Sequence, residues 1–217
     1  AMANTYKTTN ILVFGASTTQ GAWDPEGGGW VGRLNRFLME CFQQETDTYF
    51  PVYNLGIDGD TSLDLVKRFE SETQVRFIRA ERSVILFSIG INDSVLLDDG
   101  DYYVEPEGFR QNISTLISLA RKFGSIAFVG LTRVEESKTT PIPWQKRWYY
   151  RNTSIHIYDA ILKQVAIRES VPIIDLSPIF ATADYFELLD DGLHPNSEGH
   201  KKIFEIVKIQ LSKINLI

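Results

Sequence analysis

The sequence predicts an α/β protein of three layers, in which a five-stranded parallel sheet lies between two layers of helices. Three observations lead to this prediction. Five short runs rich in β-branched and aromatic residues recur along the chain, segments with helical periodicity separate them, and the runs are almost continuously apolar. Strands that are apolar on both faces need helices on both sides, and their alternation with helices is typical of a parallel sheet with right-handed crossovers.

The expected elements alternate from the first run onward. Strands are expected at Ile11–Phe14, Phe50–Leu55, Ser83–Ile89, Ser125–Leu131 and Val171–Leu176. Helices are expected at Trp30–Gln43, Leu63–Glu72, Phe109–Lys122, Asn152–Arg168 and Ser197–Ile214. The stretch 133–150 has no regular period and is long for a connection, so we interpret it as a functional loop. No repeat or linker divides the 217 residues, and we predict one domain over residues 1–217.

Composition limits the classes of function. The net charge of −6 argues against a nucleic-acid or anionic-membrane partner, since either needs a concentrated basic surface. The single cysteine, Cys41, excludes an internal disulfide framework and a cysteine-rich metal site. No apolar run reaches the ~20 residues that cross a bilayer, and the first residues lack the basic and apolar regions of a signal peptide. We therefore expect no membrane insertion and a cytoplasmic location, with the oligomeric state left open.

The first strand runs into the segment GASTTQG, which suits either a nucleophile at Ser17 or a phosphate-binding turn. Ligands of an open parallel sheet bind at the carboxyl ends of its strands, so the residues after each strand are informative. A phosphate loop needs Lys and Ser or Thr after its second glycine, and Ala22 follows Gly21 here. A dinucleotide fingerprint needs a middle glycine where Thr19 stands. A nucleotide-dependent oxidoreductase is thus the weaker interpretation.

A nucleophilic Ser17 needs a histidine to take its proton and a carboxylate to orient that histidine. His194 lies in the segment DDGLHPN, with Asp191 three residues before it and a glycine between them that permits a tight turn. An Asp–His pair within one loop is therefore possible. The same segment also reads as the start of the last helix, with Asn196 or Ser197 as its N-cap. Both interpretations are compatible.

Acyl transfer also needs hydrogen-bond donors for the oxyanion that develops on the substrate. Gly59, in NLGIDGDTS after the second strand, has a backbone amide that a ligand can approach closely. Asn92, in IGIND after the third strand, offers a carboxamide. Each alone also fits a plain structural role, Gly59 as a turn residue and Asn92 as a strand cap. Asp24, Asp58 and Asp60 lie nearby in the sequence, and we interpret all three as solvated loop acids.

The four segments together are more informative than any one of them. Ser17 follows the first strand, Gly59 the second, Asn92 the third, and an Asp191-x-x-His194 pair comes after the fifth. In this order and spacing the set resembles the SGNH hydrolases, also called the GDSL esterase/lipase family. The resemblance covers nearly the whole chain.

The resemblance implies a flavodoxin-like sheet and metal-free, cofactor-free ester hydrolysis through an acyl-enzyme. Ser17 becomes the nucleophile and, through its amide, one oxyanion donor; Gly59 and Asn92 become the other donors, and Asp191 and His194 complete the triad. One position departs from the family: its Gly-Asp-Ser is Gly-Ala-Ser here. The missing aspartate is not a triad member, so the chemistry is expected to survive, with Asp93 or Thr18 as candidates to hold the nucleophile turn.

The loop 133–152 is the candidate substrate wall. It carries Trp144, Trp148, Tyr149 and Tyr150, whose rings can line an acyl pocket or stack on a sugar. Tyr149 and Tyr150 fit equally well as the first turn of the following helix, with their rings packed on the core. We therefore predict a serine esterase that acts on a small-molecule ester, either a short-chain acyl ester or an O-acetyl group on carbohydrate. The alternatives are a non-catalytic small-molecule or carbohydrate-binding domain on the same scaffold and, less favoured, the nucleotide-dependent oxidoreductase.

Overall fold

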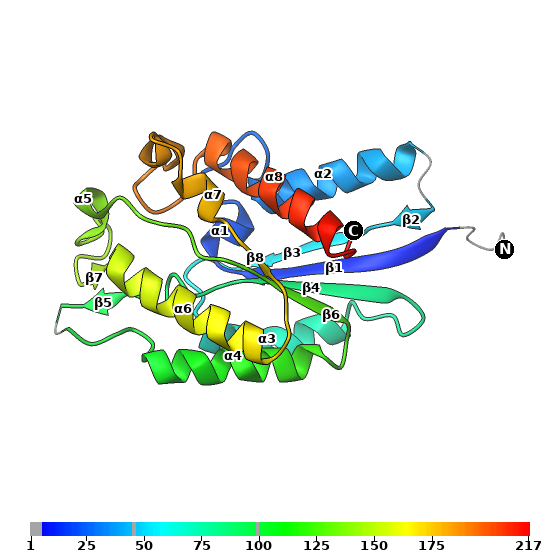
Figure 1. Cartoon of the computed structure of the whole chain (residues 1–217), viewed down its shortest axis with the longest axis horizontal. Helices are drawn as coiled ribbons and strands as arrows, with labels where there is room; N and C mark the ends of the chain where they lie inside the picture. The colour runs from blue at the N-terminus through cyan, green and yellow to red at the C-terminus, as the bar shows by residue number, and fades with distance from the viewer. Residues whose placement is uncertain (1–5, 45–46, 99) are drawn as a thin grey trace.

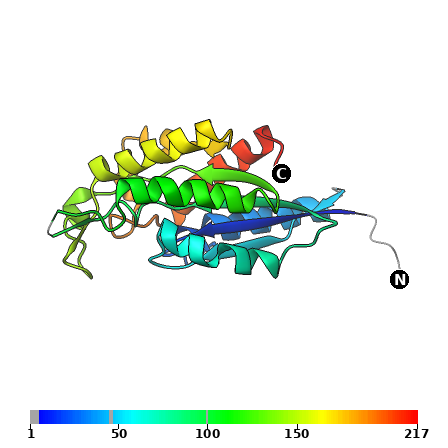
Figure 2. The ribbon, with the colours of Figure 1, turned by 90° about the horizontal axis from the view of Figure 1, so that it is seen from below.

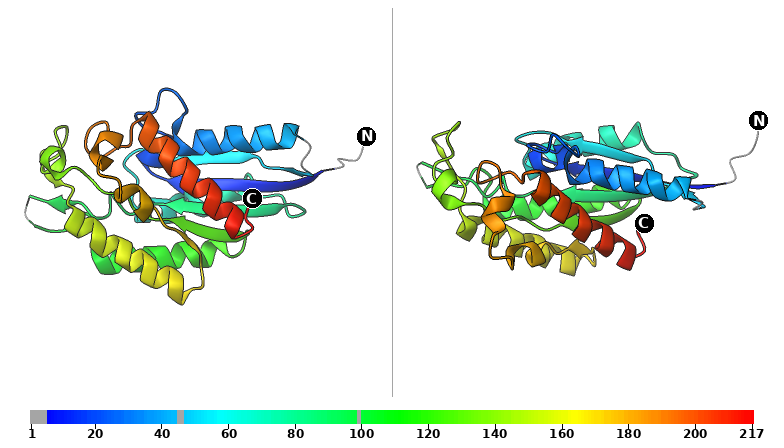
Figure 3. Two further views of the ribbon diagram at one scale, coloured as in Figure 1. Left: turned by 45° about the horizontal axis from the view of Figure 1, so that its top comes forward. Right: turned by 90° about the horizontal axis from the view of Figure 1, so that it is seen from above.

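The protein has the predicted three-layer α/β architecture. The computed structural model describes residues 6–44, 47–98 and 100–217. One face of the central sheet is covered by α2 (Gly29–Gln43) and α8 (Ser197–Lys213) (Figures 1 and 3). The opposite face is covered by α3 (Ser62–Gln74), α4 (Pro106–Ala120) and α6 (Asn152–Arg168) (Figures 1 and 2).

The sheet is parallel throughout and has the strand order of flavodoxin-like folds. Its strands are β1 (Lys7–Gly15), β2 (Thr48–Tyr49), β3 (Val52–Gly56), β4 (Arg82–Ser88), β6 (Ser125–Val129) and β8 (Ile173–Ile174). The order is β2-β1-β4-β6-β8, and β3 also pairs with β1. Since β2 and β3 lie along the same side of β1, they occupy one strand position. The sheet therefore has five positions in the order 2-1-3-4-5.

Two of the expected strands differ in detail from the observed ones. The second is interrupted at Phe50 and Pro51, because proline has no N–H to donate to a neighbouring strand. The Pro51 carbonyl still accepts a hydrogen bond of 2.8 Å from the Ile11 amide. The fifth strand is only Ile173–Ile174, and it lies at the edge of the sheet with β6 as its neighbour.

Local capping sets the starts of the helices. Thr61 and Asp64 form a reciprocal capping box, so α3 begins at Ser62. Pro106 occupies the first turn of α4, where its missing N–H costs nothing. The Asn196 side chain accepts from the Gly199 amide and caps α8. The DDGLHPN segment therefore does begin the last helix, and this role coexists with the Asp191–His194 contact described below.

Alternation along the strands produces two hydrophobic cores. Leu12 and Phe14 point to the core under α3, α4 and α6, whereas Ile11 and Val13 point to the core under α2 and α8. Successive side chains of a strand face opposite sides of the sheet, and both sides are buried here. This double burial explains why the strands read as continuous apolar runs.

The carboxyl ends of the strands meet at one end of the molecule, on the left in Figure 1, where several short elements gather. They include α1 (Ser17–Gln20), α5 (Glu136–Thr139), α7 (Ser177–Phe180) and a 3₁₀ turn (Tyr185–Leu188). A separate two-stranded antiparallel sheet joins β5 (Leu96–Leu97) to β7 (Trp148–Tyr149). This small sheet is not among the elements predicted from the sequence. One of its two strands, β7, lies together with α5 in the functional loop 133–150.

Candidate active site

The turn after β1 places Ser17 at the start of α1. Gly15 ends the strand, and a Cβ atom there would lie 2.0 Å from Thr19 Oγ1 and 2.5 Å from the Ser88 carbonyl oxygen. Only glycine therefore allows β1, β4 and α1 to approach this closely. Backbone hydrogen bonds from Gln20 to Ala16 and from Gly21 to Ser17 close the turn. Ser17 is held, largely buried, at the carboxyl end of the first strand.

Ser17, His194 and Asp191 form a continuous hydrogen-bonded chain. His194 Nδ1 lies 2.7 Å from Asp191 Oδ2, and His194 Nε2 lies 2.9 Å from Ser17 Oγ. A carboxylate only accepts hydrogen bonds, so we assign the imidazole proton to Nδ1. Nε2 is then an acceptor for the Ser17 hydroxyl proton. This is the arrangement that a general base for a serine nucleophile requires.

Asp191 is fixed by its own loop. Its Oδ1 accepts from the amides of Leu193 and His194 at 2.9 and 2.8 Å, and its Oδ2 faces the His194 ring. Burial by itself would raise the pKa of Asp191, but the hydrogen bonds and charge of His194 and the Leu193 amide outweigh burial and lower the pKa to about 2. Asp191 is therefore ionised at neutral pH.

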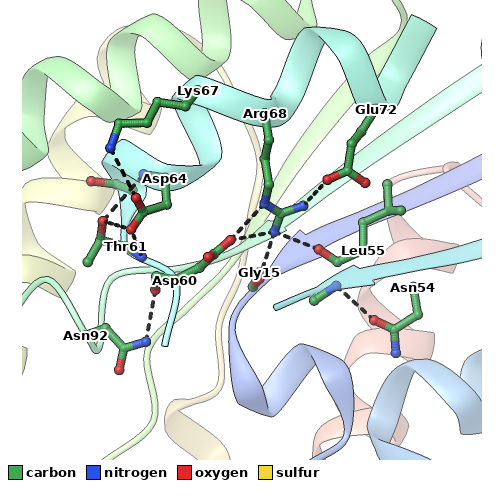
Figure 4. Close-up of polar contacts among 12 residues, drawn as sticks. Gly15, Asn54, Leu55, Asp60, Thr61, Asp64, Lys67, Arg68, Glu72 and Asn92 are labelled. Atoms are coloured by element: carbon green, nitrogen blue, oxygen red, sulfur yellow. Dashed lines mark hydrogen bonds and ion pairs between the residues drawn. The ribbon is translucent and has the colours of Figure 1, made fainter. Parts of the chain in front are cut away.

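The two loops that carry the candidate oxyanion donors are joined by a hydrogen bond. Gly59 has φ of +79°, a left-handed conformation that favours glycine, in the loop between β3 and α3. Asn92 is buried after β4, and its Nδ2 donates to the carbonyl oxygen of Asp60 at 2.9 Å (Figure 4). The residue after Gly59 thus binds Asn92 directly, and Asn92 lines the same cavity as Ser17 and His194.

One arginine connects the nucleophile turn to the oxyanion loop. The Arg68 guanidinium donates to the carbonyls of Gly15 and Leu55 at 3.3 and 2.8 Å and pairs with Asp60 at 2.7 Å (Figure 4). Burial raises the pKa of Asp60, and Arg68 opposes this shift. The interpretation of Asp60 as a solvated acid was wrong, because its carboxylate is enclosed with Arg68.

Asp93 does not hold the nucleophile turn. Its carboxylate accepts from the backbone amide and hydroxyl of Ser62, at the start of α3. Burial raises its pKa to about 6, although the Ser62 hydrogen bonds act in the opposite direction. Asp93 therefore anchors the oxyanion side of the site, and the proposed substitution of Asp93 for the missing family aspartate was wrong. The charged side chain that contacts the nucleophile turn is Arg68, which donates a hydrogen bond to the Gly15 carbonyl.

Two exposed tryptophans flank His194. Trp23 meets the imidazole edge-on at 5.9 Å between ring centroids, and Trp144 lies nearly parallel to it at 6.1 Å. Their exposed fractions are 53% and 56%. Both line an open hollow that also includes Asp58 and His194. Trp144 thus lies where the sequence analysis expected a substrate wall.

Trp23 was missed by the sequence analysis. Its indole Nε1 lies 2.8 Å from Asp191 Oδ2 and 2.9 Å from His194 Nδ1. Because Nδ1 carries a proton, we assign the indole hydrogen bond to the carboxylate. Trp23 lies two residues beyond the GASTTQG segment, and no local pattern indicates that its ring folds back onto Asp191 and His194.

A buried network positions Trp23. His200 Nε2 donates to the Ala22 carbonyl at 2.9 Å, and burial lowers the pKa of His200, which favours the neutral form. Asp24 pairs with Arg33 at 3.0 Å and accepts from the amides of Gly27 and Gly29. Asp24 is buried, so its interpretation as a solvated acid was wrong.

Trp148 and Tyr149 lie in the β5–β7 sheet. Trp148 packs on Tyr103 at 5.1 Å, and Arg151 lies 5.9 Å from the Tyr149 ring. In the described part of the chain, neither lines the hollows at Ser17 and His194. The next residue, Tyr150, is buried and donates its hydroxyl to Asn92 Oδ1 at 3.0 Å.

A cavity of about 40 Å³ lies beside the nucleophile. The residues that line it are Ser17, Asn92 and His194, together with the apolar side chains of Ile89 and Leu131.

Residues 6–44, 47–98 and 100–217 contain no group of three or more His, Cys, Asp or Glu placed to hold a metal ion. Among the helices of those same residues, none is long and apolar enough to cross a membrane.

Solved structures with a similar fold include an α/β hydrolase and an esterase. The chain resembles an α/β hydrolase enzyme from the metagenome of Lake Arreo, at a TM-score of 0.71 and 20% identity over 95% of this chain and 96% of the other. An acetylxylan esterase from Geobacillus stearothermophilus gives a TM-score of 0.71 at 19% identity, over 96% of both chains. At these identities the likeness concerns the fold.

Sequence comparison identifies the family. A Bacillus subtilis protein, the uncharacterized lipoprotein YqeF, is 24% identical over 206 residues, which cover 85% of this chain and 77% of the relative. The model of the GDSL-like lipase/acylhydrolase family matches residues 13–202, which include Ser17, Gly59, Asn92, Asp191 and His194. The chain therefore belongs to the GDSL-like lipase/acylhydrolase family and is an ester hydrolase.

Proposed function

We propose that the protein is a serine esterase that hydrolyses short acyl esters, with O-acetyl groups on carbohydrate as the favoured substrate. The observation that carries the catalytic part is the hydrogen-bonded chain from Ser17 Oγ through His194 to Asp191, at 2.9 and 2.7 Å. A serine hydroxyl is a weak nucleophile until a base takes its proton, and this chain supplies the base and its orienting carboxylate.

The proposed reaction has two halves. Ser17 Oγ attacks the ester carbonyl while His194 Nε2 takes its proton; the tetrahedral intermediate collapses, and His194 gives the proton to the departing alcohol. Water then attacks the acyl-Ser17 carbonyl, again with His194 as base, and the carboxylic acid leaves as Ser17 regains its proton. Asp191 stays ionised throughout and stabilises protonated His194.

The oxyanion of each tetrahedral intermediate needs preorganised donors. We assign this role to the amides of Ser17 and Gly59 and the Nδ2 group of Asn92. Their support is the proximity of the two loops, since the carbonyl next to Gly59 accepts from Asn92 Nδ2. The family match over residues 13–202 favours this function over a nucleotide-dependent oxidoreductase.

Two features of the site favour a short acyl group on a sugar. The cavity of about 40 Å³ beside Ser17 has room for only a few atoms, since one water needs roughly 10–15 Å³. Outside it, Trp23 and Trp144 present exposed rings on either side of His194, and aromatic faces of this kind bind the apolar faces of sugars. The acetylxylan esterase with the same fold acts on a substrate of this class.

The substrate proposal is tested by turnover of 4-nitrophenyl acetate, butyrate and octanoate and by acetate release from an acetylated xylose. We expect kcat/KM to fall from acetyl to octanoyl and to be higher for the acetylated sugar than for acetylated glycerol, a matched control without a ring. A kcat/KM that rises with chain length, or equal values for the two acetylated alcohols, would contradict the substrate class.

A further inference from the structure

Tyr150 stands apart from the other buried tyrosines. The buried tyrosines of the described residues are Tyr150, Tyr158 and Tyr185. Tyr158 donates to the Val104 carbonyl and Tyr185 to the Arg133 carbonyl, so their hydroxyls serve the main chain. The Tyr150 hydroxyl instead donates to the side chain of Asn92, a candidate oxyanion donor.

The contacts of Asn92 define which way its carboxamide faces. The Asp60 carbonyl can only accept, so the amide nitrogen must be the atom 2.9 Å from it. The amide oxygen is then the atom 3.0 Å from the Tyr150 hydroxyl, which donates. This arrangement uses one of the two N–H groups of Asn92 and leaves the other for a substrate oxygen.

The hydroxyl of Tyr150 is a dependable donor. Burial raises the pKa of Tyr150, so the phenol keeps its proton at neutral pH. Without the Tyr150 hydroxyl, Asn92 Oδ1 would lose its hydrogen-bond donor in a buried position. The carboxamide would then be held only by the hydrogen bond from its Nδ2 to the Asp60 carbonyl.

The main chain of Tyr150 is fixed at both polar atoms. Its amide donates to the Thr139 carbonyl at 3.0 Å, and its carbonyl accepts from Thr139 Oγ1 at 2.9 Å. Thr139 is fully buried at the end of α5, in the same loop that places Trp144 over His194. The loop 133–152 therefore reaches both His194 and Asn92.

We propose that Tyr150 is a positioning residue of the oxyanion hole, whose hydroxyl holds the Asn92 carboxamide with its nitrogen toward the substrate carbonyl oxygen. This inference rests on the proposed esterase function. The loop 133–152 would then have two roles. Trp144 would contact the substrate, and Tyr150 would orient a group that stabilises the transition state.

The experiment is a double-mutant cycle on 4-nitrophenyl acetate hydrolysis with Tyr150→Phe, Asn92→Ala and the double variant. We expect Tyr150→Phe to lower kcat by about 10-fold, less than the ~10²–10³-fold loss from removal of an oxyanion donor, with KM within about twofold. In the Asn92→Ala background, Tyr150→Phe should change kcat by less than about twofold, because the group it orients is gone.

Tyr158→Phe is the matched control, since it removes the hydroxyl of a buried tyrosine outside the site. It should lower the melting temperature with no change in kcat. An unchanged kcat in Tyr150→Phe, or an equal loss with and without Asn92, overturns the positioning role. If Tyr150→Phe does not fold, 3,5-difluorotyrosine at position 150 keeps the ring and alters the hydroxyl's donor strength; its effect on kcat must likewise vanish with Asn92→Ala.

Ser17→Ala separates the two proposals. If this variant keeps the wild-type rate, or if the wild type shows no turnover, the serine esterase function fails and the role of Tyr150 fails with it. If Ser17→Ala is inactive and Tyr150→Phe has wild-type kcat, only the role of Tyr150 is contradicted.

Discussion

The two halves of the site are built from contacts of very different range. Asp191 and His194 are three residues apart in one loop, and a single long-range contact joins them to Ser17, 177 positions away. The oxyanion half needs the loops after β3 and β4 and the distant Tyr150 to meet. The triad is therefore compact and interdependent, whereas the oxyanion half is distributed over several partial contributions.

This comparison predicts the largest losses on the triad side. Ser17→Ala and His194→Ala should each reduce kcat by about 10⁴-fold or more and by nearly the same factor, because nucleophile and base act as a unit. Steady-state hydrolysis of 4-nitrophenyl acetate measures both. If Ser17→Ala retains more than about a tenth of the wild-type kcat, Ser17 is not the nucleophile.

A single substitution in the oxyanion half should lower kcat less than one in the triad. Asn92→Ala should lower kcat by about 10²–10³-fold with little change in KM, since its bond strengthens as the carbonyl oxygen becomes charged. Unchanged kcat in a folded Asn92→Ala protein would remove Asn92 from the oxyanion hole. A loss as large as that of Ser17→Ala would erase the contrast between the two halves.

Trp144 should affect selectivity more than rate. Its ring is 56% exposed, so Trp144→Ala should change the melting temperature little. The ratio of kcat/KM for acetyl and butyryl esters should shift by about fivefold, equivalent to roughly 1 kcal/mol for a lost apolar contact. A fixed ratio with a melting temperature several degrees lower would place Trp144 among the structural residues instead.

Trp23 should produce the smallest change in rate. Its indole N–H donates to Asp191 Oδ2 at 2.8 Å, so it helps to hold the carboxylate that orients His194. The backbone amides of Leu193 and His194 still hold Asp191 Oδ1 when the indole is removed, so the loss is expected to be partial.

Trp23→Phe should therefore lower kcat by about threefold, which corresponds to roughly 0.7 kcal/mol, within the range of one net hydrogen bond. Trp144→Phe is the matched control, because Trp144 also contacts the His194 ring and is similarly exposed. It is expected to alter KM and leave kcat in place. An unchanged kcat in Trp23→Phe, or equal losses in both variants, would contradict the assigned hydrogen bond.

The fold class, and the edge of the sheet at which the candidate site residues lie, could be predicted from the sequence. Apolar strands that alternate with helices define the parallel sheet, and the carboxyl ends of its strands bring Ser17, Gly59 and Asn92 to one edge. The Asp191–His194 contact follows from a spacing of three residues across a glycine. Each of these inferences depends on local pattern plus one rule of sheet topology.

The parts that the sequence could not predict depend on side-chain contacts between distant segments. Two-residue strands such as β7 are too short for a periodic signal, so the position of Trp148 and Tyr149 away from His194 was not foreseen. The hydroxyl of Tyr150 meets Asn92 across 58 positions. Asp24 and Asp60 became buried because Arg33 and Arg68 fold against them, which composition alone does not reveal.

The most direct test of the serine mechanism is covalent labelling with a 4-nitrophenyl alkylphosphonate, followed by intact mass and peptide mass spectrometry. A nucleophilic Ser17 predicts one phosphonyl group per chain, located on the Ser17 peptide, with 4-nitrophenolate released in equal amount. Ser17→Ala should remain unlabelled. Wild-type protein that stays unlabelled, as a non-catalytic binding domain would, or that carries the label on another residue, contradicts the account.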